Sequence, residues 1–174
     1  MNHKDYAMTF LSKAILVAAA LALAACNNPR GGADEYEYGA NGGGISSTAL
    51  GDPSDPSSIA YFNQTIGDTV HFTVDSSNLS DQGMIILRTQ AVWLNRNPAY
   101  SILVEGHADE RGTREYNVAL GAQRAARAQQ FLISEGVSAS RLRTVSYGKE
   151  RPVEVCAEQR CWDLNRRAVV VVSN

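Results

Sequence analysis

VEGHADERGTREYN, at residues 104–117, joins an apolar segment to an amphipathic one. Thr113 has the side chain of a helix N-cap, so a helix is expected to begin directly after it. The turn before Thr113 carries several charged groups, a histidine and two glycines. Backbone N–H groups at a helix N-terminus favour anions, so this turn is the candidate binding site of the chain.

The helix after Thr113 is predicted to run to about Glu135, because Gly136 can adopt the left-handed conformation that ends helices. Its apolar stripe is expected at Val118, Ala122, Ala125 and Leu132. Its flank is expected to carry Asn117, Leu120, Arg124 and Phe131. Asp109 in the turn can therefore approach Arg124 along the side of the helix.

The rest of the chain alternates between strand and helix patterns. Strands are predicted at residues 69–74, 100–104, 142–147 and 168–172, and a further helix begins after Ser80 and ends at Asn97-Pro98. In the first strand, Val70, Phe72 and Val74 share the apolar face and His71 points away from it. The order is strand, helix, strand, helix, strand, loop, strand. This order predicts an α+β two-layer sandwich, with both helices on one face of a four-stranded mixed sheet. Right-handed crossovers would place the turns after the first two strands at the same end.

The N-terminal segment has the pattern of a secretion signal. Residues 1–25 combine lysines with an apolar run too short to span a bilayer. Leu23-Ala24-Ala25-Cys26 resembles the lipobox of bacterial lipoproteins, which implies cleavage before Cys26 and lipidation of that residue; an ordinary thiol is the alternative. Asn27 points by the same resemblance to the outer membrane, with the folded part in the periplasm. Residues 26–65 are predicted to form a flexible tether, and residues 66–174 the folded domain.

Charge and cysteine content narrow the function classes. Without the leader the chain has 14 basic and 17 acidic residues, and this acidic balance argues against a nucleic-acid partner. Cys156 and Cys161 are predicted to form a disulfide in an oxidising compartment, worth about 2 kcal/mol. Structural zinc is the weaker alternative, because beyond these cysteines the mature chain offers only His71 and His107 and a site needs four ligands. No cofactor or metal is expected.

The charged turn is open to three interpretations. Asp109 and Arg124 can form a structural salt bridge while the other charges keep the turn soluble. They can instead form a zwitterion receptor, in which Asp109 accepts an ammonium and Arg124 holds a carboxylate. A catalytic or metal cluster of His107, Asp109 and Glu110 is the third interpretation, but no nucleophile or base-orienting partner accompanies it. No catalytic residue is therefore assigned, and His107 is expected to hydrogen-bond the turn.

Several ordered motifs resemble the OmpA-like peptidoglycan-binding domain family. They are Val104–Thr113, Glu115-Tyr116-Asn117, Leu120-Gly121, Arg124-Ala125, Val145-Ser146-Tyr147-Gly148-Lys149-Glu150 and Asn165-Arg166-Arg167-Ala168. The resemblance covers about residues 66–174 and implies the OmpA-C-like fold. It also implies that Asp109 and Arg124 bind diaminopimelate, a peptidoglycan residue whose side chain ends in an ammonium and a carboxylate.

The same resemblance assigns the surroundings of this pair. Val74 and Asp75 are expected to form a pocket wall and a secondary polar contact, Thr113 and Asn117 to shape the turn, and Leu120 to line the floor. One of Arg166 and Arg167 is expected to pair within the fold. The sequence departs from the family at Thr73, where many members have aspartate, and in the loop between Cys156 and Cys161.

The resemblance implies a non-enzymatic, lipid-anchored protein that tethers the outer membrane to the cell wall. Its expected partners are peptidoglycan, the outer membrane through the lipid, and the periplasmic β-propeller protein TolB with other Tol proteins. The alternative is a periplasmic adaptor that binds envelope proteins without binding the wall directly. A peptidoglycan-degrading lipoprotein is the enzymatic alternative.

Overall fold

The structure, a computed structural model, describes residues 50–174. The predicted signal peptide, Cys26 and the tether as far as residue 49 lie outside this part. Within it, no helix is both long and apolar enough to cross a membrane.

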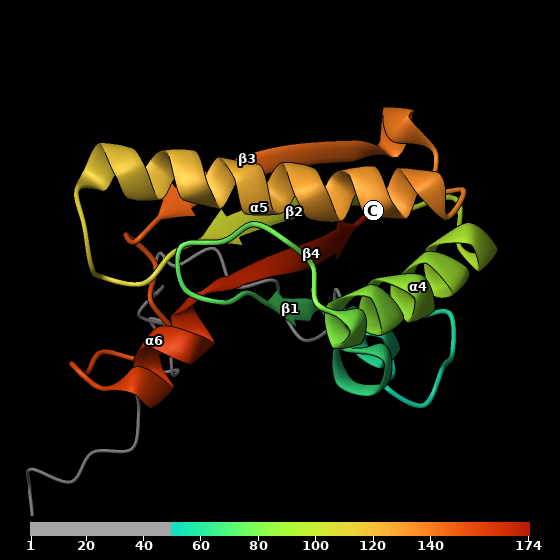
Figure 1. Cartoon of the computed structure of the whole chain (residues 1–174). Helices are drawn as coiled ribbons and strands as arrows, with labels where there is room; N and C mark the ends of the chain where they lie inside the picture. Colours follow the sequence, from blue (N-terminus) through green and yellow to red (C-terminus); the bar gives the residue numbers. More distant parts are fainter. Residues whose placement is uncertain (1–49) are drawn as a thin grey trace, which may run out of the picture. The chain divides into compact units, whose positions relative to one another are not determined.

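Four strands form one mixed sheet (Figure 1). They are β1 (Thr69–His71), β2 (Ser101–His107), β3 (Leu142–Gly148) and β4 (Arg167–Ser173), in the order β1-β4-β2-β3. β4 runs antiparallel to both β1 and β2, whereas β2 and β3 are parallel. β1 and β2 therefore point the same way, and the segments that follow them meet at one end of the sheet. This confirms the predicted α+β fold class.

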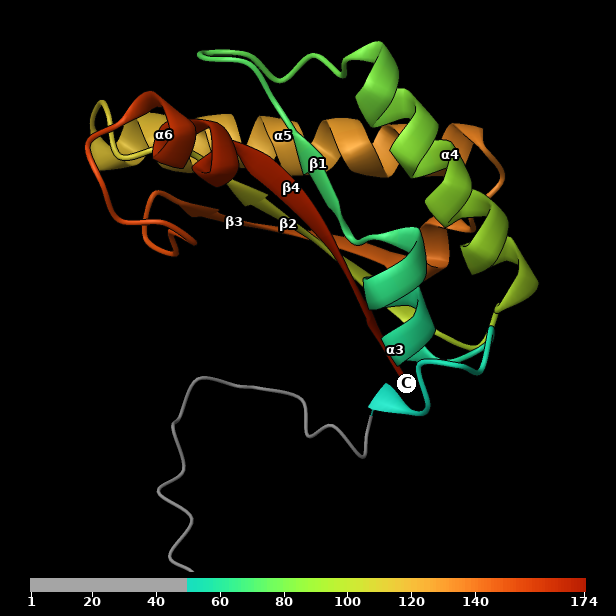
Figure 2. The same cartoon turned by 90° about the horizontal axis from the view of Figure 1, so that it is seen from below.

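Two long helices lie on one face of this sheet, α4 (Asp81–Arg96) and α5 (Arg114–Ser134) (Figures 1 and 2). The predicted caps are confirmed: Ser80 accepts a hydrogen bond from the Gly83 N–H, and Thr113 accepts one from the Tyr116 N–H. Gly136 has φ +95°, the left-handed conformation expected after the helix. The core between the layers contains Leu87 and Leu94 of α4, Ala125 and Leu132 of α5, and Val104 and Val170 of the sheet.

The buried face of α5 differs from the predicted stripe. Val118 is 39% exposed and Ala122 is also exposed. The residues that face the sheet or the core are instead Asn117, Leu120, Gly121, Arg124, Ala125, Ala128 and Leu132. Ala125 and Leu132 of the predicted stripe are confirmed, whereas Val118 and Ala122 were wrong. The prediction allowed only apolar residues on that face, but the fold buries an asparagine and an arginine there.

Residues 50–65 were assigned to the tether, and this assignment was wrong. They form α3 (Ile59–Tyr61) and η2 (Phe62–Ile66), in which Ile59 and Phe62 are buried in the core. The Trp93 indole N–H also donates to the carbonyl of Pro56, at 2.7 Å. The polar composition around Ile59 and Phe62 hid two side chains that bury enough apolar area to order the segment.

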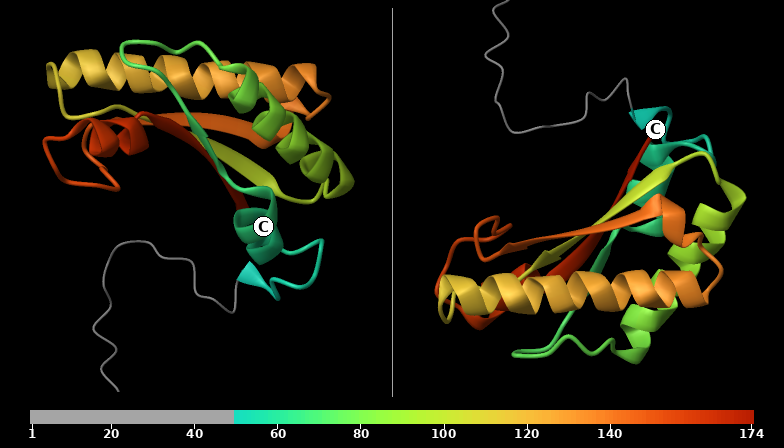
Figure 3. Two further views of the ribbon diagram at one scale, coloured as in Figure 1. Left: turned by 60° about the horizontal axis from the view of Figure 1, so that its bottom comes forward. Right: turned by 90° about the horizontal axis from the view of Figure 1, so that it is seen from above.

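Two further differences lie at the end of the sheet where α5 begins. β1 stops at His71, three residues earlier than predicted, and Val74 is 57% exposed rather than on the apolar face. The predicted loop between β3 and β4 contains a short helix, α6 (Gln159–Asn165). At the opposite end of the sheet, η3 (Ala139–Arg141) precedes β3. Figure 3 shows α6, in red, near the yellow turn that leads into α5, and Trp162 of α6 donates to Glu110 of that turn.

Candidate functional site

The segments after β1 and β2 enclose a pocket of about 300 Å³, which we call the turn pocket. It is lined by Val74, Asp75, Asp109, Arg111, Gly112, Tyr116, Asn117, Leu120, Arg124 and Arg166. Six of the seven residues that the sequence assigned to a ligand site are in this list. Thr113 is the exception, because its side chain caps α5 instead.

Asp109 is held by two arginines, and neither of them is Arg124. Arg111 donates to both carboxylate oxygens, with Nη2 2.8 Å from Oδ2, and the Nη1 of Arg166 lies 2.9 Å from the same Oδ2. Burial opposes ionisation of Asp109, but the hydrogen bonds from Arg111 and Arg166 outweigh it and lower the pKa of the carboxyl below its ordinary value. Of the three interpretations of the charged turn, the structural salt bridge between Asp109 and Arg124 is therefore wrong.

Arg124 binds backbone carbonyls. Its guanidinium donates to the carbonyls of His107 at 2.7 Å, Ser76 at 2.9 Å and Thr73 at 3.2 Å. The side chain is fully buried behind the pocket wall and lies against the Phe72 ring. Burial first, and then the positive charge of Arg166, lowers the pKa of Arg124 to about 10, so it remains charged at neutral pH. Arg124 thus joins the loop after β1 to the end of β2.

The loop after β1 presents Asp75 to the pocket. Asp75 has φ +53°, the one non-glycine residue of residues 50–174 in the left-handed region, which aspartate tolerates better than most residues. The Tyr116 hydroxyl of α5 donates to its Oδ1. Two residues of α5 therefore fix this loop: Arg124 holds the backbone carbonyls of Thr73 and Ser76, and Tyr116 holds the Asp75 carboxylate.

The turn after β2 is fixed just as closely. The Asn117 side-chain N–H donates to the Arg111 carbonyl at 2.8 Å. Lys149, from the segment after β3, donates to the carbonyls of Glu110 and Gly112, at 3.1 and 2.8 Å. The turn is preorganised, so little conformational entropy is lost when a ligand enters.

Sequence reasoning did not assign Arg111, Tyr116 and Arg166 to the site. The Asn-Arg-Arg motif gave a partial signal, and the structure resolves it: Arg166 pairs with Asp109 and Asp163, whereas Arg167 donates to the carbonyls of Asn165 and Arg151. Nothing in the local pattern around Arg111 distinguishes it from a solvated arginine.

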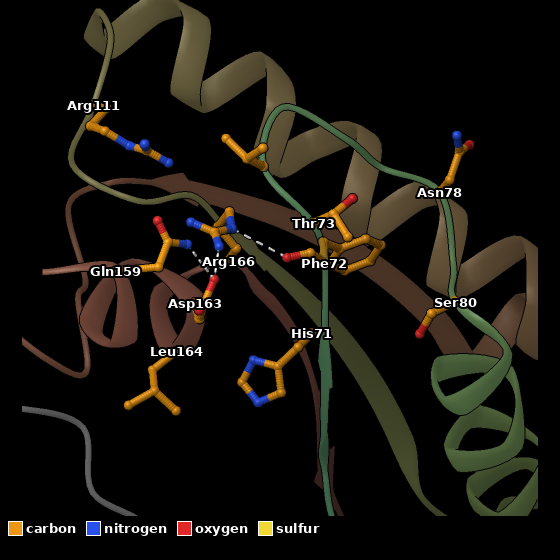
Figure 4. A pocket seen from close by; sticks show the side chains of 11 residues that line it. His71, Phe72, Thr73, Asn78, Ser80, Arg111, Gln159, Asp163, Leu164 and Arg166 are labelled. Carbon is orange, nitrogen blue, oxygen red and sulfur yellow. Dashed lines mark hydrogen bonds and ion pairs between the residues drawn. The ribbon is translucent and has the colours of Figure 1, made fainter.

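A second, larger pocket of about 660 Å³ lies beside the first, and we call it the α6 pocket. Figure 4 shows its labelled side chains, which come from the loop after β1, from the charged turn and from α6. It is lined by His71, Phe72, Thr73, Val74, Asn78, Ser80, Arg111, Gln159, Asp163, Leu164 and Arg166. Val74, Arg111 and Arg166 line both pockets, so the two cavities share one wall.

Cys156 and Cys161 form the predicted disulfide, with Cα atoms 5.9 Å apart. Cys161 is buried at the start of α6, next to Trp162 and Asp163. The disulfide therefore fixes the helix that borders the α6 pocket. Within residues 50–174, no group of three or more His, Cys, Asp or Glu side chains is arranged to hold a metal ion.

His107 does not hydrogen-bond the turn through its ring, contrary to the prediction. Its carbonyl accepts from Arg124, but neither ring nitrogen has a hydrogen-bond partner. Nε2 lies 3.5 Å from a Glu105 carboxylate oxygen, and the ring lies near Tyr147. Burial first, and then the charges of Arg167 and Arg151, lowers the pKa of His107 to about 4.

This lowered pKa predicts a pH-dependent stability. Below its ordinary pKa of about 6.5 the unfolded chain binds a proton at His107, and the folded chain does so only near pH 4. The contribution of His107 is thus complete above pH 6.5 and decreases as the pH falls toward 4. We expect urea unfolding to show a loss of about 2 kcal/mol over this interval, less than the full shift implies because Glu105 lies close to the ring.

His107→Phe should flatten this dependence, because phenylalanine fills the buried site and does not titrate. His71→Gln is the matched variant. Partial desolvation also lowers the pKa of His71, but the His71 side chain is exposed and lies outside the core. A pH dependence that His71→Gln removes and His107→Phe leaves intact would contradict this assignment.

A family sequence model and two relatives with the same name match this chain. The sequence model of the OmpA family matches residues 71–161. The chain is 48% identical over 159 residues to the "Peptidoglycan-associated lipoprotein" of Mesorhizobium japonicum, an alignment that covers 91% of this chain and 90% of the relative. It is also 48% identical to the protein of the same name from Agrobacterium fabrum, with 91% and 85% covered.

Solved structures agree with the fold. The crystal structure of the peptidoglycan-associated lipoprotein from Burkholderia pseudomallei is 38% identical, with a TM-score of 0.62, and the match covers 72% of this chain and 99% of that one. The C-terminal domain of Helicobacter pylori MotB, at 24% identity and a TM-score of 0.58, covers 62% and 84% and shows the same fold.

Proposed function

The chain belongs to the OmpA family, and from that membership and its turn pocket we propose that it is a peptidoglycan-binding lipoprotein. In this proposal the turn pocket takes the diaminopimelate side chain of a stem peptide. Lipidated Cys26 and the tether after it hold the domain to the outer membrane, so that binding links that membrane to the cell wall. The protein acts by recognition and not by catalysis.

The observation that carries the proposal is the arrangement of opposite charges around one small cavity. Asp75 and Asp109 supply carboxylates, while Arg111, Arg124 and Arg166 supply guanidinium groups. A ligand that ends in both an ammonium and a carboxylate matches this set. An isolated cation or an isolated anion would match the charges of only one sign in this set.

The ammonium must compete for Asp109, whose two oxygens already accept four hydrogen bonds, one of them from the Arg111 backbone N–H. The Arg111 side chain is 42% exposed and the Arg166 side chain 3%. Displacing Arg111 costs less, because water can solvate it, whereas Arg166 would be left buried without its partner. The ligand therefore replaces Arg111 at Asp109 and leaves Arg166 in place.

The ligand carboxylate is attracted by Arg124 through the loop that this residue organises. Arg124 is fully buried and bonded to three carbonyls, so it acts from behind the wall and screening by water is weak there. Each charged contact of a half-exposed pocket contributes modestly, and affinity for one stem peptide is expected to be moderate. Many anchored copies facing a polymeric wall raise the effective concentration and offset this.

The names of the relatives support the wider role. Proteins called peptidoglycan-associated lipoproteins match nearly the whole chain, including the segment before the domain. We place the protein in the Tol-Pal system of envelope maintenance and cell division, with TolB and other Tol proteins as partners. TolB would compete with peptidoglycan where its contact surface overlaps the turn pocket.

Asp109→Asn should weaken binding of a diaminopimelate-containing tripeptide at least tenfold, because the amide cannot hold an ammonium by charge. Calorimetry on the mature full-length chain measures this directly. The wild type should also prefer that peptide to one with lysine in place of diaminopimelate, since lysine lacks the terminal carboxylate.

Glu110→Gln is the matched control, because Glu110 lies in the same turn but outside the pocket and its contact with Trp162 suits an amide as well. Circular dichroism establishes that each variant is folded. Peptide binding that Asp109→Asn does not weaken would reject the site. If the folded wild type bound neither the diaminopimelate peptide nor purified sacculi, the adaptor role would be favoured.

A further inference from the structure

Arg111 is the one residue of the charged turn that borders both pockets. Its guanidinium lies 4.2 Å from the centre of the Trp162 ring of α6, and its Nε and Nη2 donate to Asp109. Within residues 50–174, its third nitrogen, Nη1, makes no hydrogen bond. Trp162 is itself fixed, because its indole N–H donates to Glu110 at 3.1 Å. A stacked, partly exposed arginine with an open edge is suited to bind a carboxylate.

The α6 pocket offers that open edge a mostly apolar cavity. Phe72, Val74 and Leu164 supply its apolar lining. The Gln159 amide lies near Arg166 in Figure 4 and donates to Asp163 at 2.9 Å. Val74 and Leu164 are 57% and 41% exposed, so unburied apolar area is available to a ligand. Arg166 is less available to bind a ligand, because its guanidinium already donates hydrogen bonds to the Phe72 carbonyl and to the carboxylates of Asp109 and Asp163.

We propose that the α6 pocket is a second subsite, in which Arg111 binds a carboxylate of the stem-peptide residue adjacent to diaminopimelate. This inference rests on the proposed function of the turn pocket. The shared wall of Val74, Arg111 and Arg166 makes the two cavities one continuous surface, so a ligand seated in the first extends over Val74 into the second. Ammonium binding at Asp109 releases Arg111 for this contact.

Two neighbouring residues of a stem peptide have the required chemistry. The D-glutamate before diaminopimelate carries a free α-carboxylate, and the D-alanine after it ends a tetrapeptide with one. Both combine a carboxylate with a short aliphatic portion that suits the apolar surfaces. In either case Arg111 determines whether the protein distinguishes a carboxylate from an amide in the wall peptide.

Calorimetry with the mature full-length chain and three tetrapeptides tests the subsite. The first carries both carboxylates, the second has the D-glutamate α-carboxylate amidated, and the third has the terminal D-alanine amidated. One of the two amides should bind about fivefold to tenfold more weakly than the parent, and which one it is identifies the adjacent residue. Arg111→Gln should abolish this difference, whatever its effect on overall affinity.

Arg114→Gln is the matched control: Arg114 is the first residue of α5, pairs with Glu150 and lines neither pocket, so the difference should persist. Leu164→Asn should weaken all the tetrapeptides while the protein stays folded. Equal binding of all three peptides by the wild type, the same difference in Arg111→Gln, or no effect of Leu164→Asn would overturn the subsite. A lysine-containing tetrapeptide separates the two proposals, because weaker binding of that peptide supports the turn pocket independently.

Discussion

Arg124→Met is expected to lower the free energy of unfolding by about 2–4 kcal/mol. The guanidinium satisfies the carbonyls of Thr73, Ser76 and His107 from a fully buried position. Methionine fills a similar volume but donates no hydrogen bond. The His107 carbonyl is buried and would lose its side-chain donor, and the loop after β1 would lose two of its hydrogen bonds to α5.

The size of this effect follows from two opposing contributions. Three hydrogen bonds from a charged donor, at about 1.5–3 kcal/mol each, would exceed the expected loss. Burial of the charge offsets part of that gain, as the lowered pKa of Arg124, about 10, indicates. Thr73 is exposed and Ser76, three residues later in the same loop, is half-buried, so water can reach both carbonyls once Arg124 is removed. The difference remains destabilising because the His107 carbonyl is not accessible to water in this way.

Urea unfolding at pH 7 measures the change, with Arg127→Met as the control. Arg127 lies one turn further along α5 and is exposed, so its replacement should change stability by less than about 0.5 kcal/mol. Arg124→Lys keeps the charge but cannot reach three carbonyls, and an intermediate loss is expected. Equal stabilities of the Arg124→Met and Arg127→Met variants would show that the three carbonyls do not depend on Arg124.

Because Arg124 has this structural role, binding experiments on Arg124 variants and on Asp109 variants must be interpreted differently. Arg124 shapes the loop that carries Val74 and Asp75, so its loss removes binding through structure as well as through charge. Asp109 faces the pocket and its oxygens are shared with the half-exposed Arg111. Asp109→Asn, together with the lysine peptide, is therefore the more direct test of ligand recognition.

The sequence predicted well the features that depend on nearby residues. The caps at Ser80 and Thr113 and the left-handed Gly136 follow from local backbone chemistry, and all three are found. The alternation of strands and helices predicted the layers of the fold. The meeting of the segments after β1 and β2 followed from the handedness of crossovers, which does not depend on individual side chains.

Features that depend on long-range pairing could not be predicted in this way. Arg111 and Arg166 are the partners of Asp109 because α6 positions them: Trp162 packs against Arg111, and Asp163 pairs with Arg166. No periodicity reveals a seven-residue helix after a disulfide loop. The family resemblance identified which residues gather at the pocket, but the contacts of Arg124 with carbonyls required coordinates.

Gly106→Ala is expected to cost about 3 kcal/mol or more, because β2 and α5 touch through their backbones at this point. A Cβ built on Gly106 overlaps the carbonyl oxygen of Gly121 and lies 3.1 Å from the Ala125 side chain. A Cβ on Gly121 would meet the Gly106 carbonyl at 2.8 Å in return. The helix cannot move aside without separating Arg124 and Asn117 from the turn that they bind.

Gly83→Ala in α4 is the matched control, since its Cβ would meet only side-chain atoms, with Val70 nearest at 3.2 Å. The higher helix propensity of alanine offsets that contact, and the net change should stay within about 1 kcal/mol. Urea unfolding compares the two variants, and binding of the diaminopimelate peptide reports whether the pocket has opened. A Gly106→Ala variant as stable as Gly83→Ala would mean that α5 can shift away from β2, and full peptide binding by that variant would show that the pocket does not depend on this close contact.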